Sequence, residues 1–248
     1  MLALMVLRFG PLAPPVAVEK APGRPLRLVS LSTSPDSAMF TPEELHELER
    51  RFGVHGPQPD LAQLFTEGLD ELAPLRSHTL RRLESLVPTL LAEGRRRGVN
   101  PMLMAAILYD EMQHAKPGKD LPIAAHSGLF RDHGPAQLSV GELVQQGLLK
   151  PKASEQDVDA AVDELLNPDA NVRVLAGQLA RLQKLLGVPL RHSLKVSSDQ
   201  RDAKVAATLA YLHNGKLDYP ARILHYMQDP ELHAIVYGKR EVPATTVI

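Results

Sequence analysis

The chain of 248 residues contains no cysteine and no tryptophan, and aromatic residues make up only 4% of it. The absence of cysteine excludes disulfides, thiolate catalysis and cysteine-ligated zinc sites. The formal net charge is only −1, so no overall excess of Lys or Arg argues for nucleic acid or an anionic membrane as a partner. We therefore expect no nucleic-acid binding by the chain as a whole.

Long hydrophobic runs are also missing. No stretch reaches the roughly 20 apolar residues that span a bilayer, so we expect no transmembrane segment. Residues 1–7 are apolar, but no basic region precedes them, Arg8 interrupts them and no clear small-residue cleavage site follows. This N-terminus is a poor signal peptide, and nothing in the sequence predicts the compartment or the oligomeric state.

Proline is frequent in residues 10–38, which predicts a Pro-rich N-terminal arm over residues 1–40 with at most a short strand inside it. Thr41-Pro42-Glu43-Glu44 then marks a helix start, with Thr as N-cap, Pro at the first helical position and Glu three residues after the cap. We expect an N-terminal helical extension over residues 41–75.

Helical periodicity dominates the rest of the chain, and the predicted fold class is mainly α. The sequence contains neither the alternating strands nor the Gly-rich turns of a nucleotide-binding α/β fold. Leucine spacing and cap signals predict four more helices and one short one: 76–97 with a kink or break at Pro88, a helix capped by Asn100-Pro101, one from Asn167-Pro168 to Gly187, one over about 199–213, and one around 220–227.

Glu111 is the strongest candidate for a catalytic residue. It ends a nearly all-apolar segment that begins at Asn100, and a carboxyl group partly removed from water is more readily protonated, which suits it to donate a proton. After a polar, His-rich loop follows Gly134-Pro135-Ala136-Gln137. The glycine permits a tight turn, and the glutamine amide can both donate and accept hydrogen bonds.

Four motifs occur in a fixed order along the chain. They are the first motif (residues 100–111, ending in Glu111), the second (134–139, Gly-Pro-Ala-Gln-Leu-Ser), the third (167–173, Asn-Pro-Asp-Ala-Asn-Val-Arg) and the fourth (210–215, Ala-Tyr-Leu-His-Asn-Gly). Their order and spacing resemble the lysozyme-like lytic transglycosylases and goose-type lysozymes over roughly residues 90–228.

The chain departs from that family at three points. Met112 stands where the family usually has Ser after the Glu, Pro135-Ala136 replaces Leu-Met, and Leu212-His213 separates Tyr211 from Asn214. The chain also has few aromatic residues on which sugar rings could stack.

The resemblance implies a lysozyme-like catalytic domain over residues 76–230, a C-terminal tail over 231–248, peptidoglycan glycan strands as partner and action at the cell wall. Glu111 would protonate the bridging oxygen of a β-1,4 linkage between N-acetylmuramic acid and N-acetylglucosamine, and then act as base on the muramyl 6-hydroxyl to give a 1,6-anhydro product. No cofactor or metal ion is implied.

The resemblance also assigns substrate-binding roles. Gly134 would preserve the turn, Tyr211 would orient the carboxyl group by its hydroxyl, and Gln137 and Asn214 would hydrogen-bond the sugar.

Ordinary hydrolysis would need a second acid roughly 5 to 9.5 Å from the first. Asp132, two residues before Gly134, is the best candidate. Asp110 is expected to point away from the catalytic face, because neighbouring helix positions diverge by about a quarter turn or more.

Three other interpretations remain open. Glu111 and His114 are spaced as metal ligands, with His126, Asp132 and His133 in the next loop, which would suit a metal-dependent helical hydrolase or a metal-binding bundle. A non-catalytic glycan-binding or interaction module on the same fold would explain the departures around Met112 and Tyr211. A purely structural interpretation would have Glu111 reach solvent, place Tyr211 in the core and make Asn214-Gly215 a helix C-cap.

Overall fold

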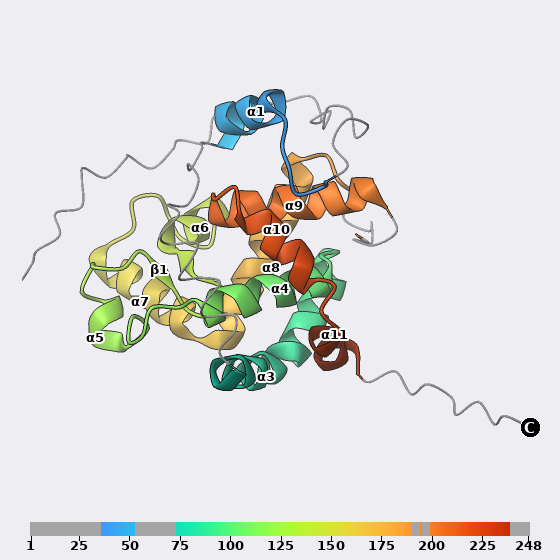
Figure 1. Ribbon diagram of the computed structural model, residues 1–248. Helices are drawn as coiled ribbons and strands as arrows, with labels where there is room; N and C mark the ends of the chain where they lie inside the picture. Colours follow the sequence, from blue (N-terminus) through green and yellow to red (C-terminus); the bar gives the residue numbers. More distant parts are fainter. Residues whose placement is uncertain (1–35, 53–72, 190–193, 195–198, 239–248) are drawn as a thin grey trace, which may run out of the picture.

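The computed structural model describes residues 36–52, 73–189, 194 and 199–238 (Figure 1). Most of the predicted Pro-rich arm, with its possible short strand, and much of segment 41–75 lie outside these residues. The described part is mainly helical, with ten helices and one two-stranded antiparallel ribbon, which confirms the predicted class. None of these helices has both the length and the apolar character needed to cross a bilayer.

The elements keep the labels of Figure 1. The helices are α1 (Pro42–Phe52), α3 (Ala73–Arg97), α4 (Pro101–Gln113), α5 (Pro122–Ala125), α6 (Val140–Gln145), α7 (Glu155–Leu166), α8 (Pro168–Leu185), α9 (Gln200–Asn214), α10 (Tyr219–Tyr226) and α11 (Pro230–Tyr237); the strands are β1 (Asp132–His133) and β2 (Leu138–Ser139).

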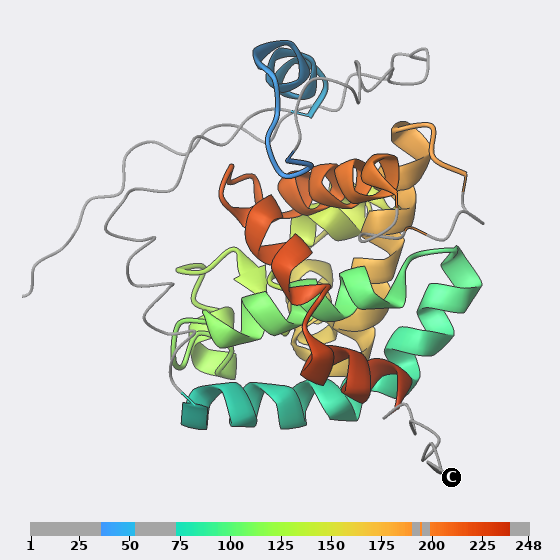
Figure 2. The same ribbon diagram turned by 45° about the vertical axis from the view of Figure 1, so that its right-hand side comes forward.

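Helix α4 is the central element of the fold. It packs against α3, α10 and α11, and in Figures 1 and 2 it lies between α3 and the pair α9 and α10. Residues 102–110 are all buried, as expected for a helix that is apolar on every side. Glu111 is partly exposed near the end of this buried helix, so it lies where the core meets solvent.

The predicted helix starts are confirmed by their caps. Thr41 and Glu44 form a reciprocal capping box, with N···O distances of 2.9 and 3.2 Å. The side chain of Asn100 accepts hydrogen bonds from the amides two and three residues later, and that of Asn167 from the amide three residues later. At the other end of α9, Gly215 adopts a left-handed conformation with φ of 83°, the expected C-cap geometry.

Helix α3 continues through Pro88, and Figure 2 shows it bending partway along its length. A proline removes one backbone hydrogen bond and crowds the preceding turn, so a bend is its usual consequence. The helix does not break, because buried leucines on both sides of the proline, including Leu83, Leu86 and Leu90, anchor it in the core. There it packs mainly against α4 and α8, and α11 also contacts it.

Four helices were not predicted: the short helices α5 and α6, and helices α7 and α11. Helix α7 begins with a capping box formed by Ser154 and Asp157. Helix α11 begins at Asp229-Pro230 and packs against α3 and α4 through Leu232 and other residues. The packed helical body therefore extends to Tyr237, past residue 230, where the sequence placed the start of a tail.

Candidate functional site

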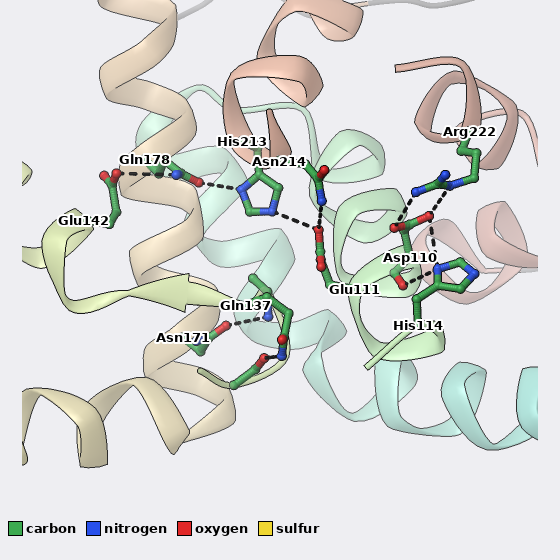
Figure 3. Close-up of polar contacts among 12 residues, drawn as sticks. Asp110, Glu111, His114, Gln137, Glu142, Asn171, Gln178, His213, Asn214 and Arg222 are labelled. Atoms are coloured by element: carbon green, nitrogen blue, oxygen red, sulfur yellow. Dashed lines mark hydrogen bonds and ion pairs between the residues drawn. The ribbon is translucent and has the colours of Figure 1, made fainter. Parts of the chain in front are cut away.

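Two adjacent carboxyl groups at the end of α4 point to opposite sides (Figure 3). Asp110 turns toward α10, where Arg222 Nε lies 2.9 Å from its Oδ1, and the Nδ1 atom of His114 lies 3.4 Å from the same oxygen. Burial raises the pKa of Asp110, but the hydrogen bond from His114 and the charge of Arg222 outweigh it and hold the pKa below its ordinary value. Asp110 is thus directed away from Glu111, as its position one residue earlier predicts.

Glu111 turns toward the last turn of α9. Its Oε1 atom accepts a hydrogen bond from Asn214 Nδ2 at 3.0 Å and lies 3.5 Å from His213 Nε2. The side chain is 13% exposed, so it is held by protein and still reachable from solvent. No Lys or Arg of the described residues forms an ion pair with this carboxyl group.

His213 is itself held from the opposite side. Its Nδ1 atom lies 2.7 Å from Gln178 Oε1 on α8, and Gln178 Nε2 donates to Glu142 on α6 at 3.4 Å. Glu142 forms an ion pair with Arg181 at 2.6 Å. Figure 3 shows the resulting chain from Glu142 through Gln178 and His213 to Glu111. Sequence reasoning missed this chain, although His213 lies inside the fourth motif.

The structure places Tyr211 elsewhere than the resemblance implies. Its ring packs on Phe40 with centroids 5.3 Å apart, and burial and the charge of Glu49 raise the pKa of its hydroxyl. No hydrogen bond joins that hydroxyl to another described residue. Helix α9 buries this position against the segment that precedes α1, so Tyr211 is a core residue and does not orient Glu111.

Tyr219, at the start of α10, is the tyrosine beside the catalytic candidate. It is fully buried, and its pKa lies well above the ordinary value because of burial, followed by the nearby charges of Glu111 and Asp110. Its position four residues after the fourth motif carries no signal that distinguishes it from other apolar core positions.

The second and third motifs bind each other. Gly134 has φ of +72°, and a Cβ atom there would lie 2.1 Å from Leu165 O and 2.5 Å from Asn171 Nδ2, so only glycine fits. The Asn171 side chain accepts from Ala136 N at 2.8 Å and donates to His133 O at 2.9 Å. An asparagine on α8 therefore clamps the turn that contains the second motif.

Gln137 closes that turn with a φ of +50°, the only positive φ of a described residue other than glycine. Such backbone conformations cost about 1 to 3 kcal/mol and cluster at functional sites. The Gln137 side chain donates to Gly134 O at 2.6 Å and accepts from Lys119 Nζ. Both ends of the amide are thus occupied within the protein, and its predicted contact with a sugar stays a prediction.

Asp132, the predicted second acid, lies in the same electrostatic neighbourhood as Glu111. It is exposed to water yet surrounded by enough protein to be partly desolvated. This desolvation and the charge of Glu111 raise the pKa of Asp132, while the charge of Lys119 opposes the rise. Lys119 is buried, and burial lowers the pKa of its ammonium group against the opposing charges of Asp132, Asp120 and Glu111.

The predicted metal ligands are not brought together. His114 turns its Nδ1 atom toward Asp110, while Glu111 points to α9. His126 pairs with Asp163 on α7 at 2.9 Å. Within the described ranges, no three His, Asp or Glu side chains are placed to hold one metal ion.

Comparisons with protein-family models, with curated proteins and with solved structures gave no match for this chain.

Proposed function

We propose that the protein cleaves peptidoglycan glycan strands at the linkage from N-acetylmuramic acid to N-acetylglucosamine, as a lytic transglycosylase that acts at the cell wall. The supporting observation is that the four motifs make pairwise contacts across long stretches of sequence. Asn214 of the fourth motif donates to Glu111 of the first, and Asn171 of the third binds the turn of the second. Pairing of this kind is expected if the ordered motifs build one site.

Glu111 would act as both acid and base. It protonates the bridging oxygen, and that proton leaves with the 4-hydroxyl of the departing sugar. The carboxylate then removes the proton of the muramyl 6-hydroxyl, whose oxygen bonds to C1 to form the 1,6-anhydro ring. One carboxyl group completes this cycle without an attacking water. Asn214 and His213 both contact the same oxygen of this carboxyl group, Oε1.

In this proposal Asn214 positions the carboxyl group, in place of the sugar contact that the resemblance implies. Its Nδ2 atom already donates to Glu111, and its Oδ1 atom is buried with no hydrogen-bond partner among the described residues. An amide donor at Oε1 fixes the plane of the carboxyl group.

The test is mass spectrometry of the soluble fragments that the protein releases from purified peptidoglycan. The wild type should release muropeptides lighter by one water than the hydrolytic products, with or without chelator, and Glu111→Gln should release none. Asp132→Asn should leave the anhydro product unchanged. Reducing ends that disappear in Asp132→Asn would instead identify a hydrolase with two acids, and no release by the wild type would overturn the proposed cleavage.

A glycan-binding module without catalysis is the second candidate. It is favoured by the burial of Tyr211 away from Glu111, which leaves the carboxyl group without the tyrosine that the resemblance assigns to orient it. Sedimentation with insoluble peptidoglycan, unchanged in Glu111→Gln and without release of fragments, would identify this activity.

A further inference from the structure

The chain from Glu142 to Glu111 determines which nitrogen of His213 is protonated. Glu142 is paired with Arg181, and an ionised carboxylate only accepts hydrogen bonds. Gln178 must therefore present its NH₂ group to Glu142 and its oxygen to His213. The opposite orientation would set two oxygens against each other. Because Gln178 Oε1 can only accept, the Nδ1 atom of His213, 2.7 Å away, is the protonated nitrogen.

This tautomer leaves a lone pair on the Nε2 atom of His213, which faces Glu111 Oε1 at 3.5 Å. An ionised carboxyl oxygen also has only lone pairs. The contact is therefore unfavourable when both groups lack a proton and favourable when one proton lies between them. That proton either makes Glu111 a donor to a neutral imidazole or makes His213 an imidazolium beside a carboxylate.

Burial of the side chains in this chain strengthens the requirement for one proton between His213 and Glu111. The side chain of His213 is 3% exposed, and Gln178 and Glu142 are also buried. Water is thus largely excluded from the chain and cannot easily supply an alternative partner to either imidazole nitrogen. In surroundings of low dielectric, hydrogen-bonded groups polarise one another, and an unsatisfied group is costly.

We propose that Glu111 and His213 hold one shared proton, which is the proton that the reaction transfers, and that Gln178 and Glu142 are positioning residues that fix the tautomer of His213. The catalytic part of this inference rests on the proposed function, whereas the shared proton does not. In the cycle the pair holds one proton at the start, gives it to the bridging oxygen and recovers one from the 6-hydroxyl.

The unprotonated intermediate explains how one residue can be first an acid and then a base. Once the proton has left, the Glu111 carboxylate faces the lone pair of His213. That repulsion favours return of a proton. Three other groups act on the pair: Asp132 near both members, Lys119 near Glu111, and the Tyr219 hydroxyl beside Glu111. Asp132 and Lys119 act through opposite charges, and Tyr219 acts through its neutral hydroxyl, because burial raises its pKa.

The first test is the protonation of His213 and Glu111 in the full-length chain, measured by ¹⁵N and ¹³C nuclear magnetic resonance, with the signals assigned by their loss in His213→Gln and Glu111→Gln. Nδ1 should carry a proton at every pH at which the protein is folded. Nε2 and the Glu111 carboxyl carbon should respond in the same pH steps, because they bind protons as a pair. A neutral ring protonated on Nε2, or separate titration steps for the two groups, would overturn the proposal.

Gln178→Leu tests the positioning role, and Gln183→Leu is its matched control. Gln183 is another buried glutamine on α8, and its amide reaches Gly98 O at 3.5 Å, away from this chain. In Gln178→Leu the proton of the neutral His213 ring should no longer be confined to Nδ1, whereas in Gln183→Leu it should remain on Nδ1. A fixed Nδ1 proton in Gln178→Leu would contradict the role assigned to Gln178.

The catalytic consequence is measured on soluble glycan strands. Gln178→Leu should lower kcat by about 10- to 100-fold, as loss of an outer partner does at other sites, with KM nearly unchanged and an altered pH profile. Gln183→Leu should keep the wild-type profile. An unchanged kcat with an altered tautomer would overturn the catalytic part alone. A wild type that releases no product would refute the proposed function, while the resonance measurement still decides whether the proton is shared.

Discussion

Asp110 and Glu111 are adjacent carboxyl groups with opposite surroundings. Asp110 is 3% exposed and meets the cationic Arg222 at 2.9 Å, whereas Glu111 is 13% exposed and meets an amide and an imidazole. A cation favours only the ionised form of a carboxyl group. An imidazole tolerates both forms, because it can donate or accept a proton. The partner, and not the carboxyl group itself, therefore decides which of the two can serve acid–base chemistry.

Glu111→Gln replaces the carboxyl group that the imidazole contacts by an amide that cannot donate an acidic proton. We expect it to lower fragment release by about 10³-fold, within the range for loss of a general acid, and to change thermal stability little, since an amide can still accept from Asn214. Initial rates and thermal unfolding of the same preparations measure both quantities. Residual activity close to that of the wild type would remove Glu111 from the mechanism.

The proposed site around Glu111 also includes the turn of the second motif, which only glycine can make at residue 134. Gly134→Ala should cost about 3 to 4 kcal/mol of unfolding free energy, since the added Cβ would overlap Leu165 O and Asn171 Nδ2. Gly128→Ala is the control, because Gly128 has the same φ of +72° with nothing within 4 Å, and it should cost only the left-handed conformation, about 1 to 2 kcal/mol. Equal losses in urea denaturation would show that the clamp of Asn171 adds nothing.

Asp110→Asn tests whether the ion pair between Asp110 and Arg222 stabilises the fold. It leaves Arg222 without its carboxylate, and we expect a loss of about 2 to 3 kcal/mol at pH 7, below the full cost of breaking a buried pair because Arg222 is partly exposed. The activity of the folded variant should remain, since Asp110 points away from Glu111.

The effect of Asp110→Asn should also depend on pH with a defined sign. The folded pKa of Asp110 lies below the unfolded one, so its contribution is present above the unfolded pKa, about 4, and is lost as the pH falls through the folded pKa. Urea denaturation at pH 7 and at lower pH should show the two proteins converging in acid. A constant difference would mean that the ion pair is not the source of the stability.

The smallest expected effect is that of Asp132→Asn. The folded pKa of Asp132 is raised, so its stabilising contribution is complete below the unfolded pKa and is lost as the pH rises through the folded pKa. Removing the charge should therefore raise the melting temperature slightly at pH 7 and leave it unchanged near pH 3. A lower melting temperature at pH 7 would show that Lys119 stabilises the charge of Asp132 more than desolvation and Glu111 oppose it.

Local rules were sufficient for much of the fold. Asn100, Asn167 and Thr41 announce helix starts, because short polar side chains satisfy the first free backbone amides, and the apolar run before Glu111 predicts a buried helix that ends in a carboxyl group. The end of the domain was placed too early, at residue 230, because the cap signal of Asp229-Pro230 was not used and helix α11 follows it.

These local rules could not predict which side chain each site residue contacts. The resemblance implied that Tyr211 would orient Glu111, yet helix α9 presents His213 and Asn214 to that carboxyl group and buries Tyr211 against Phe40. Residues two or three positions apart on a helix differ in direction by about 200° and 300°. Because His213 and Asn214 lie two and three positions after Tyr211, they face Glu111 while Tyr211 faces the core.

The amino-acid sequence thus specified most of the longer helices, their caps and the carboxyl groups at the end of a buried helix, because these follow from propensities and spacing within one turn of chain. Only the packing of α10 against α4 and α9, and of α8 against α9, decided that Asp110 meets an arginine, that Glu111 meets a histidine and that Gln178 determines where the proton of that histidine lies. Hydrogen-bond partners a hundred residues apart depend on the angles between packed helices, and no local pattern encodes those angles.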